Sequence, residues 1–268
     1  MAYLEQKKPI AETGIQVSPL GLGTVKIGRD KAVKYPDGFQ IPNDEQVIAL
    51  LEQAWESGIN LIDTAPAYGR SEQRLGELLK KVRREWIIAT KAGEYFDAVS
   101  GESHYDFTPE SLIKSIENSL KTLQQDALDI VLIHSDGNDE HIIRHHGALE
   151  VLADLKQRGW IRASGMSTKT VTGGMLTLEQ SDIAMVMHNL QYEEEQAVIE
   201  QAAKLNKGIF IKKALGSGHL AKQAGTDTVQ DNFDFIFNEP AVSSVIIGTI
   251  NPAHLYDNIS KAVKALTE

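Results

Sequence analysis

Short apolar runs alternate with longer amphipathic segments along most of the chain. The runs are rich in β-branched residues, and the segments between them repeat apolar residues at the three- and four-residue spacing of a helix. Eight strands are predicted, at residues 20–23, 59–63, 86–91, 128–134, 161–166, 183–187, 208–212 and 242–247. The helices between them are expected to begin near Asp44, Ser71, Thr108, Asp139, Lys169, Glu193, Thr228 and Asn251.

Eight repeats of strand and helix predict an α/β fold, the closed (β/α)8 TIM barrel. An open doubly wound sheet would have fewer strands and a GxGxxG turn after the first, where this chain has GLGTVKIG. Residues 4–18 contain two short extended pieces around Thr13 and Gly14, which predict an N-terminal β-hairpin at the bottom of the barrel. Because no linker or repeat divides the chain, residues 1–268 are expected to form a single domain.

Composition narrows the class of ligand. The net charge of −10 disfavours nucleic acid and anionic membranes, so small molecules are the expected partners. The chain has no cysteine, which excludes disulfides, thiolate metal sites and cysteine nucleophiles. It has neither a signal peptide nor eighteen consecutive apolar residues, and we expect a cytoplasmic protein. No oligomeric state follows from the sequence.

Polar residues end three neighbouring predicted strands, the position at which TIM barrels carry their active sites. Asp63, Lys91 and His134 end the second, third and fourth strands, and Tyr68 lies in the loop after the second. Together they suit the reduction of a carbonyl group. Tyr68 would donate a proton to the oxygen, and Lys91, held by Asp63, would lower the pKa of Tyr68. A neutral His134 would donate a hydrogen bond to the same oxygen.

Each residue alone has an ordinary structural explanation, as a bonded histidine, a packed tyrosine or a snorkelling lysine. Two other functions also remain open. Lys91 could form a Schiff base in a barrel lyase, although Asp63 favours the charged form of the amine. The chain could also be a dinucleotide-binding sensor with little turnover.

The sequence resembles the aldo-keto reductases along almost its whole length. The resemblance rests on GLGT, GINLIDTAPAYGRSEQRLGELLK, IIATKAG, LDIVLIH, IRASGMS, KKALGSG and SSVIIGTINPAHLYDNI, in that order. It implies a (β/α)8 barrel that reversibly transfers hydride between NAD(P)H and an aldehyde or ketone. Tyr68 would be the general acid, assisted by Lys91, Asp63 and His134.

The resemblance also implies a cofactor extended across the barrel mouth. Ser167 and Asn189 would lie near the nicotinamide amide, and Leu215 and Ser217 near the pyrophosphate. Backbone amides at Gly248 and Thr249 and at the start of the last helix would suit a phosphate. The full set of implied cofactor residues is Gly23, Thr24, Asp63, Ser167, Asn189, Leu215, Ser217, Gly248, Thr249, His254, Asp257 and Asn258.

The chain departs from the family pattern at four residues. Thr168 follows Ser167 where many members have asparagine, and Asn189 is aligned with a glutamine. Gly248 and His254 replace the lysine and arginine that bind the 2′-phosphate in many NADPH-specific relatives. We expect NADPH as the cofactor, with NADH possible.

The sequence supports three further predictions, which concern a pair of histidines, an aromatic loop and an insert. His141 and His145 have chelate spacing but no HExxH glutamate, and no metal site is expected. The aromatic loop at residues 92–107 is expected in part to line a substrate pocket. The insert at residues 25–42 is expected to fold over substrate or cofactor.

Overall fold

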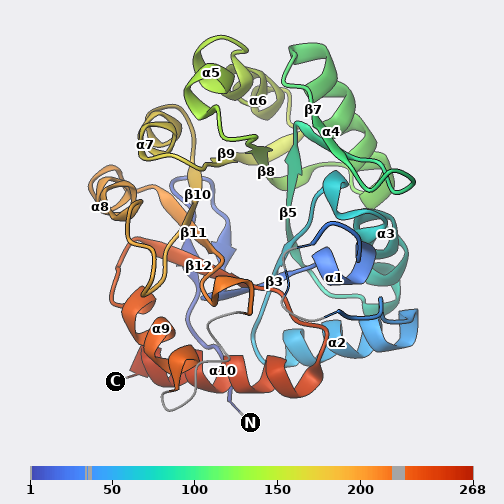
Figure 1. Ribbon diagram of the computed structural model, residues 1–268, viewed down its shortest axis with the longest axis vertical. Coiled ribbons are helices and arrows are strands. Elements are labelled where there is room, and N and C mark those ends of the chain that lie inside the picture. Colours follow the sequence, from blue (N-terminus) through green and yellow to red (C-terminus); the bar gives the residue numbers. More distant parts are fainter. Residues whose placement is uncertain (1, 34, 36–37, 219–226, 268) are drawn as a thin grey trace.

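Eight parallel strands close into a barrel in the computed structural model, which describes residues 2–33, 35, 38–218 and 227–267. The strand order around the barrel is β10-β11-β12-β3-β4-β5-β8-β9, and the predicted TIM barrel is confirmed (Figure 1). The strands are β3 (Leu20–Gly23), β4 (Leu61–Asp63), β5 (Ile87–Ala92), β8 (Leu128–His134), β9 (Ile161–Ser167), β10 (Ile183–Met187), β11 (Gly208–Lys212) and β12 (Val242–Ile247). Five of them have the predicted bounds, because apolar strands buried on both faces are visible in sequence.

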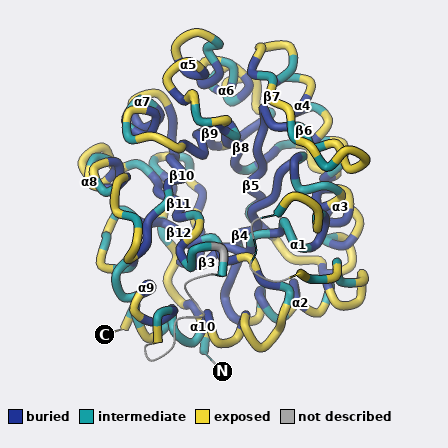
Figure 2. Tube along the Cα trace, viewed as in Figure 1, coloured by how far each residue is buried: buried dark blue, intermediate teal, exposed yellow. Residues whose placement is uncertain are grey.

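Helices surround the barrel and bury one face each against it, so that the strands are dark and the outer helix faces light in Figure 2. The helix predicted to begin at Asp139 is instead two helices. They are separated near Gly147, which has a φ of 62° and immediately precedes the second helix. The helices are α1 (Val25–Gly28), α2 (Asp44–Glu56), α3 (Ser71–Val82), α4 (Pro109–Leu123), α5 (Asp139–Arg144), α6 (Ala148–Gln157), α7 (Val171–Gln180), α8 (Gln196–Leu205), α9 (Thr228–Phe237) and α10 (Pro252–Thr267).

The predicted N-terminal hairpin closes the bottom of the barrel. Strand β1 (Lys8–Pro9) pairs antiparallel with β2 (Gln16–Val17). Ile10, Ile15 and Val17 are buried in the same apolar cluster as the barrel-interior residues Leu61 and Ile183. Because these side chains plug the N-terminal ends of the strands, a ligand can reach the barrel only from the opposite end.

Candidate active site

A cavity of about 580 Å³ lies at the C-terminal ends of the barrel strands. It runs from the ends of β4, β5 and β8 to the beginning of α10. The structure brings most of the sequence-predicted residues to it, and these are Gly23, Asp63, Tyr68, Lys91, His134, Ser167, Leu215, Gly248, Thr249, His254, Asp257 and Asn258.

Two predicted cofactor residues do not line this cavity. Thr24 is buried, and its hydroxyl donates to the carbonyl of Asp63 at 2.9 Å, so that it fastens β3 to β4. Asn189 lies beyond β10, where its amide donates to the carbonyl of Lys213 at 3.0 Å. Met185 lines the cavity from β10 instead. Ser217 belongs to the turn Gly216–Gly218, and its side chain lies outside the described part of the chain.

Asp63 and Lys91 form a buried ion pair at the ends of β4 and β5. The Nζ atom of Lys91 lies 2.6 Å from Oδ1 of Asp63, and it also donates to the carbonyl of Thr64 at 3.0 Å. The two residues are only 3% and 2% exposed. The strand register makes this pair possible, because Asp63 stands opposite Ala89 on the adjacent strand, two residues before Lys91 and on the same face.

Tyr68 ends a short 3-10 turn, Pro66–Tyr68, that a close backbone contact holds in place. Gly69 follows with φ of 61°, and a Cβ atom there would lie 2.3 Å from the carbonyl oxygen of Gly28. A Cβ atom on Gly28 would in turn lie 2.3 Å from the carbonyl oxygen of Tyr68. Side chains at these positions would push the end of α1 away from the tyrosine turn, so two glycines are required for this contact.

The phenol of Tyr68 lies beside the ion pair, but its pKa is raised rather than lowered. Burial raises the pKa of Tyr68 well above 10, and the charge and hydrogen bond of Asp63 act in the same direction. The pKa of Tyr68 is therefore not brought toward neutrality as the sequence predicted, because burial and Asp63 outweigh any effect of Lys91. Its ammonium faces the ring, 4.7 Å from the centroid, and Asp63 already compensates its charge. The phenol stays protonated at neutral pH, the state that a proton donor needs.

His134 stands over the same cavity with its ring perpendicular to that of Tyr68, at 6.2 Å between centroids. A residue that the sequence analysis missed, Glu94, faces it from strand β6 (Glu94–Phe96), and Oε2 of Glu94 lies 2.8 Å from Nδ1 of His134. Nη1 of Arg29 lies 3.9 Å from Oε1 of Glu94, so a second cationic side chain faces this carboxylate.

Glu94 determines where a neutral His134 carries its proton. A carboxylate only accepts, so a neutral ring beside it holds the hydrogen on Nδ1 and presents Nε2 as an acceptor. Burial lowers the pKa of His134, against the raising effect of Glu94, and the predicted neutral ring agrees with that direction. The prediction that this neutral ring donates to a carbonyl oxygen does not agree with the geometry. Donation from Nε2 requires the imidazolium, which Glu94 stabilises.

We expect the Glu94→Gln variant to lose the acid dependence of stability that this carboxylate provides. Burial raises the pKa of Glu94, but His134, Ser103 and Arg29 outweigh burial and bring the value from 4.5 to about 2. Because the folded pKa is below the unfolded one, this stabilisation is complete above pH 4.5 and is lost as the pH falls toward 2. Urea titrations from about pH 6 to about pH 3 should show the stability difference between wild type and variant shrinking. A difference independent of pH would contradict the assignment.

Lysine side chains give the cavity a positive balance in an acidic protein. Five lysines and three aspartates line it, namely Lys26, Lys91, Lys212, Lys213 and Lys261 with Asp63, Asp227 and Asp257. The chain as a whole carries −10. This contrast favours an anionic ligand at the mouth. Lys212 ends β11 as Asp63 and His134 end their strands, so the same strand-end rule could have found it.

The far end of the cavity differs from the sequence-based expectation for a phosphate site. Amides of Ala253 and His254, at the start of α10, already donate to Oδ1 of Asn251 at 2.9 and 3.4 Å. The only cation beside them that lines the cavity, within the described residues, is Lys261, which bonds Asp227 and Asp257 at 2.9 and 2.8 Å. Two amides at the start of this helix are therefore already bonded to a side chain, and the phosphate site stays a prediction.

The insert at residues 25–42 contributes to the cavity, whereas the aromatic loop at residues 92–107 does not. Lys26 and Tyr35 of the insert line the cavity, and the Nζ atom of Lys26 lies 4.0 Å from the centre of the Tyr35 ring. The aromatic loop instead folds as the hairpin of β6 and β7 (Ser103–Tyr105). Its aromatic residues do not line the cavity: Tyr95 bonds Ser111 of α4, and Phe107 is buried in the core. The prediction that this loop lines the pocket is wrong for those residues.

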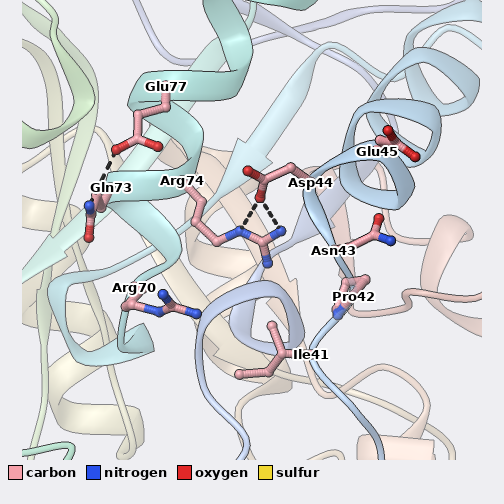
Figure 3. Close-up of a pocket in the computed structure, with 9 residues that line it drawn as sticks. All are labelled: Ile41, Pro42, Asn43, Asp44, Glu45, Arg70, Gln73, Arg74 and Glu77. Carbon is pink, nitrogen blue, oxygen red and sulfur yellow. Dashed lines mark hydrogen bonds and ion pairs between the residues drawn. The ribbon is translucent and has the colours of Figure 1, made fainter.

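A second, open groove of about 670 Å³ lies on the outside of the barrel between α2 and α3 (Figure 3). Its centre is Arg74, which donates twice to Oδ1 of Asp44, at 3.0 and 2.6 Å, and also to the carbonyl of Ile27 at 2.6 Å. Arg74 is 8% exposed and joins α3 to α2 and to α1. Since its lining residues include neither a histidine nor a tyrosine, we interpret this groove as a structural junction.

The Arg74→Ala variant is expected to lower the free energy of unfolding by about 1–3 kcal/mol, because the buried carbonyl of Ile27 loses its donor. Gln73→Ala, on the exposed side of the same helix, is the control and should change stability by less than about 0.5 kcal/mol. Chemical denaturation of both variants measures the difference. Equal stabilities would show that the junction contributes nothing.

The described residues contain no cluster of three or more potential metal ligands. Within the same residues, no helix is both long enough and apolar enough to cross a bilayer.

Comparisons with known proteins agree on one family. The model of the Aldo/keto reductase family matches residues 19–234. A solved Pseudomonas aeruginosa structure assigned to the aldo-keto reductases is 47% identical, has a TM-score of 0.89, and covers 99% of this chain and 97% of that one.

Two curated relatives are more distant. The uncharacterised oxidoreductase YqkF of Bacillus subtilis is 25% identical over 301 residues, covering 98% of this chain and 93% of that one. The NADH-specific methylglyoxal reductase of Escherichia coli is 34% identical over 172 residues, which are 60% of this chain and 51% of that one.

Proposed function

Because the chain belongs to the aldo/keto reductase family, a family of nicotinamide-dependent oxidoreductases of alcohol and carbonyl groups, we propose that it reduces small aldehydes or ketones with Tyr68 as the proton donor. One observation supports this most directly. Tyr68, His134 and the Asp63–Lys91 pair meet at one end of a single cavity, and the phenol is protonated.

Tyr68 and the ion pair divide the work of neutralising the carbonyl oxygen. A bound reduced nicotinamide supplies hydride to the carbonyl carbon, and the oxygen then carries the negative charge. Tyr68 gives its proton to that oxygen, which is a far stronger base than a phenolate. Lys91, held under the ring by Asp63, stabilises the phenolate that remains.

His134 orients the oxygen from the other side. Its Nδ1 faces Glu94, and its remaining nitrogen is left for the cavity. Burial favours the neutral ring and Glu94 the imidazolium, and only the imidazolium would donate from Nε2 to the developing oxyanion. The neighbouring carboxylate, beside Arg29, therefore orients this imidazole and supports its charged form against burial.

The residues at the mouth fit a dinucleotide. The cavity is lined by more lysines than aspartates, and its apolar lining includes Met185, Leu215 and Ile246. Ser167 and Asn258 supply hydroxyl and amide groups, 3% and 8% exposed, toward its two ends. These are suitable partners for a nicotinamide amide and an adenine, the positions that the family resemblance gives them.

The charged residues at the adenosine end of the cavity reduce the expected preference for NADPH over NADH. A 2′-phosphate there would meet Lys261, but also the two carboxylates of Asp227 and Asp257 that already bond it. A ribose diol could donate to those carboxylates. We keep NADPH as the proposed cofactor and expect NADH to be used as well.

Turnover with both cofactors tests the function. Loss of the absorbance of NADPH, and separately of NADH, is followed with 4-nitrobenzaldehyde and with a panel of small aldehydes, ketones and sugars. Oxidation of the cofactor that depends on the carbonyl compound is expected. Tight cofactor binding without turnover would favour the dinucleotide sensor and would contradict the proposal.

The Schiff-base lyase is disfavoured by the buried pair. Lys91 is bonded to a carboxylate 2.6 Å away, whereas an attacking amine must be uncharged and accessible. Borohydride added with a keto substrate should trap no adduct on Lys91, as peptide mass spectrometry would show.

A further inference from the structure

Lys212 is a half-buried cation at the mouth that has no role in the proposed chemistry. It ends β11 and lines the cavity, and its Nζ atom donates to Oγ of Ser167 at 2.9 Å and to the carbonyl of Thr168. In the described part of the chain these are its only hydrogen-bond partners, and no carboxylate oxygen lies within 4 Å. The nearest acidic influence is Glu195, which instead accepts from the amide of Met187 at 2.8 Å.

The strand register places this ammonium next to the reacting centre. Ser167 is the direct partner of His134 across β8 and β9, and adjacent strands lie about 4.8 Å apart. Strand β10 lies between β9 and β11, so the Lys212 side chain spans the end of one strand to bond Ser167, and Met185 of that strand lines the same cavity. Its charge is close enough to contribute to the lowering of the pKa of His134.

Hydride transfer requires the nicotinamide ring to lie in contact with the carbonyl group held by Tyr68 and His134. Ser167, Met185 and Lys212 line the cavity from the three strands that follow β8 around the barrel, and Ser167 pairs with both His134 and Met185. A ring that contacts the carbonyl from this side would lie near the ammonium, which bonds Ser167. The reduced ring is uncharged and the oxidised ring carries a positive charge.

We propose that the Lys212 ammonium disfavours the oxidised, positively charged nicotinamide, so that the site binds NAD(P)H more tightly than NAD(P)⁺. This inference rests on the proposed reductase function and adds to it a preference for the reduced form of the cofactor, so that the oxidised form leaves more readily. The electron balance is that of the reductase itself: the ring loses a hydride and gains one positive charge, while the carbonyl carbon gains the hydride and its oxygen gains a proton from Tyr68. The positive charges of the ammonium and of the oxidised ring repel each other. Among the described residues, no carboxylate lies at ion-pair distance from Lys212 to compensate its charge.

Dissociation constants of the two cofactor forms test the inference without turnover. NADPH is titrated by its own fluorescence, and NADP⁺ by competition, in wild type, Lys212→Met and Lys212→Arg. Lys212→Met should reduce the ratio of the NADP⁺ constant to the NADPH constant by roughly tenfold, as expected for one partly screened charge a few ångströms away. Lys212→Arg keeps the charge and should retain most of the ratio.

Wild-type protein provides a second measurement, because the methionine variant also loses two hydrogen bonds. Burial lowers the pKa of Lys212 to about 8. As the pH rises through this value the ammonium loses its charge, so NADP⁺ affinity should increase between about pH 7 and about pH 9 while NADPH affinity changes little. The charged groups that act on Lys212 from the surrounding elements are Glu195, Lys213, Asp139 and Lys169, with His134 and Lys91 across the mouth.

The outcomes separate the inference from the function on which it rests. A ratio that is the same in wild type and Lys212→Met, with both affinities weakened in parallel, would assign Lys212 to phosphate binding or to the fold and would overturn the inference. The reductase function would survive that result, provided that carbonyl-dependent oxidation of NADPH is observed. Absence of both dinucleotide binding and turnover would instead remove the function itself.

Discussion

Tyr68→Phe is expected to lower the rate of carbonyl reduction by about 100- to 10,000-fold, the usual contribution of a positioned general acid. The change removes one oxygen atom and keeps the ring that packs against His134 and covers Lys91. NADPH binding, followed by cofactor fluorescence, should remain close to that of wild type, because no part of the dinucleotide needs this hydroxyl. The rate is measured under single-turnover conditions, so that product release does not mask the chemical step.

Tyr256→Phe is the matched control, since Tyr256 is 50% exposed on α10 and does not line the cavity. Its turnover should equal that of wild type. Ordinary turnover in Tyr68→Phe would show that the proton comes from another group, and the observation on which the proposed function rests would lose its meaning.

Lys91→Met is expected to have a large effect on stability as well as on activity. The substitution leaves the carboxylate of Asp63 buried without its cation, which costs about 3–5 kcal/mol when one partner of a buried pair is removed. It also removes the charge that compensates a Tyr68 phenolate. A loss of activity in this variant alone could therefore reflect unfolding.

The double variant Asp63→Asn with Lys91→Met separates the two effects. Removing both charges should recover most of the lost stability, because a buried pair replaced as a whole is often nearly neutral. Activity should remain low, because the phenolate left by proton transfer has lost the cation beneath its ring. Chemical denaturation and single-turnover reduction are measured on the same samples. A stable double variant with wild-type turnover would refute the role given to Lys91.

Much of the fold could be predicted because barrel strands are apolar on both faces. The end of β10 could not be predicted in the same way, because the apolar pattern does not show where the chain leaves the strand. Side chains alternate along a strand, and Asn189 lies in phase with Met185, but the strand ends at Met187 and the chain turns in the bridge between Asn189 and Tyr192. On this strand Met185 therefore lines the cavity, while Asn189 lies past the strand end and does not.

The four residues of the catalytic proposal were found by the strand-end rule, yet their electrostatics were not. Whether a lysine lowers the pKa of a tyrosine depends on which atom its nitrogen faces and on how well its charge is already paired. Both are set by packing between β4, β5 and the tyrosine turn. Glu94 escaped notice for a similar reason, because it follows a strand end by two residues and reaches His134 only after β6 folds back.

The contact between Gly28 and Gly69 has a consequence for inhibition. Helix α1 begins the segment that carries Lys26 and Tyr35 over the mouth, and its last residue touches the backbone of the turn that ends in Tyr68. With no side chain between them to absorb a displacement, the two segments must move together. A compound lodged against Tyr35, which lines the same cavity as Tyr68, would then also press on the turn that holds the phenol.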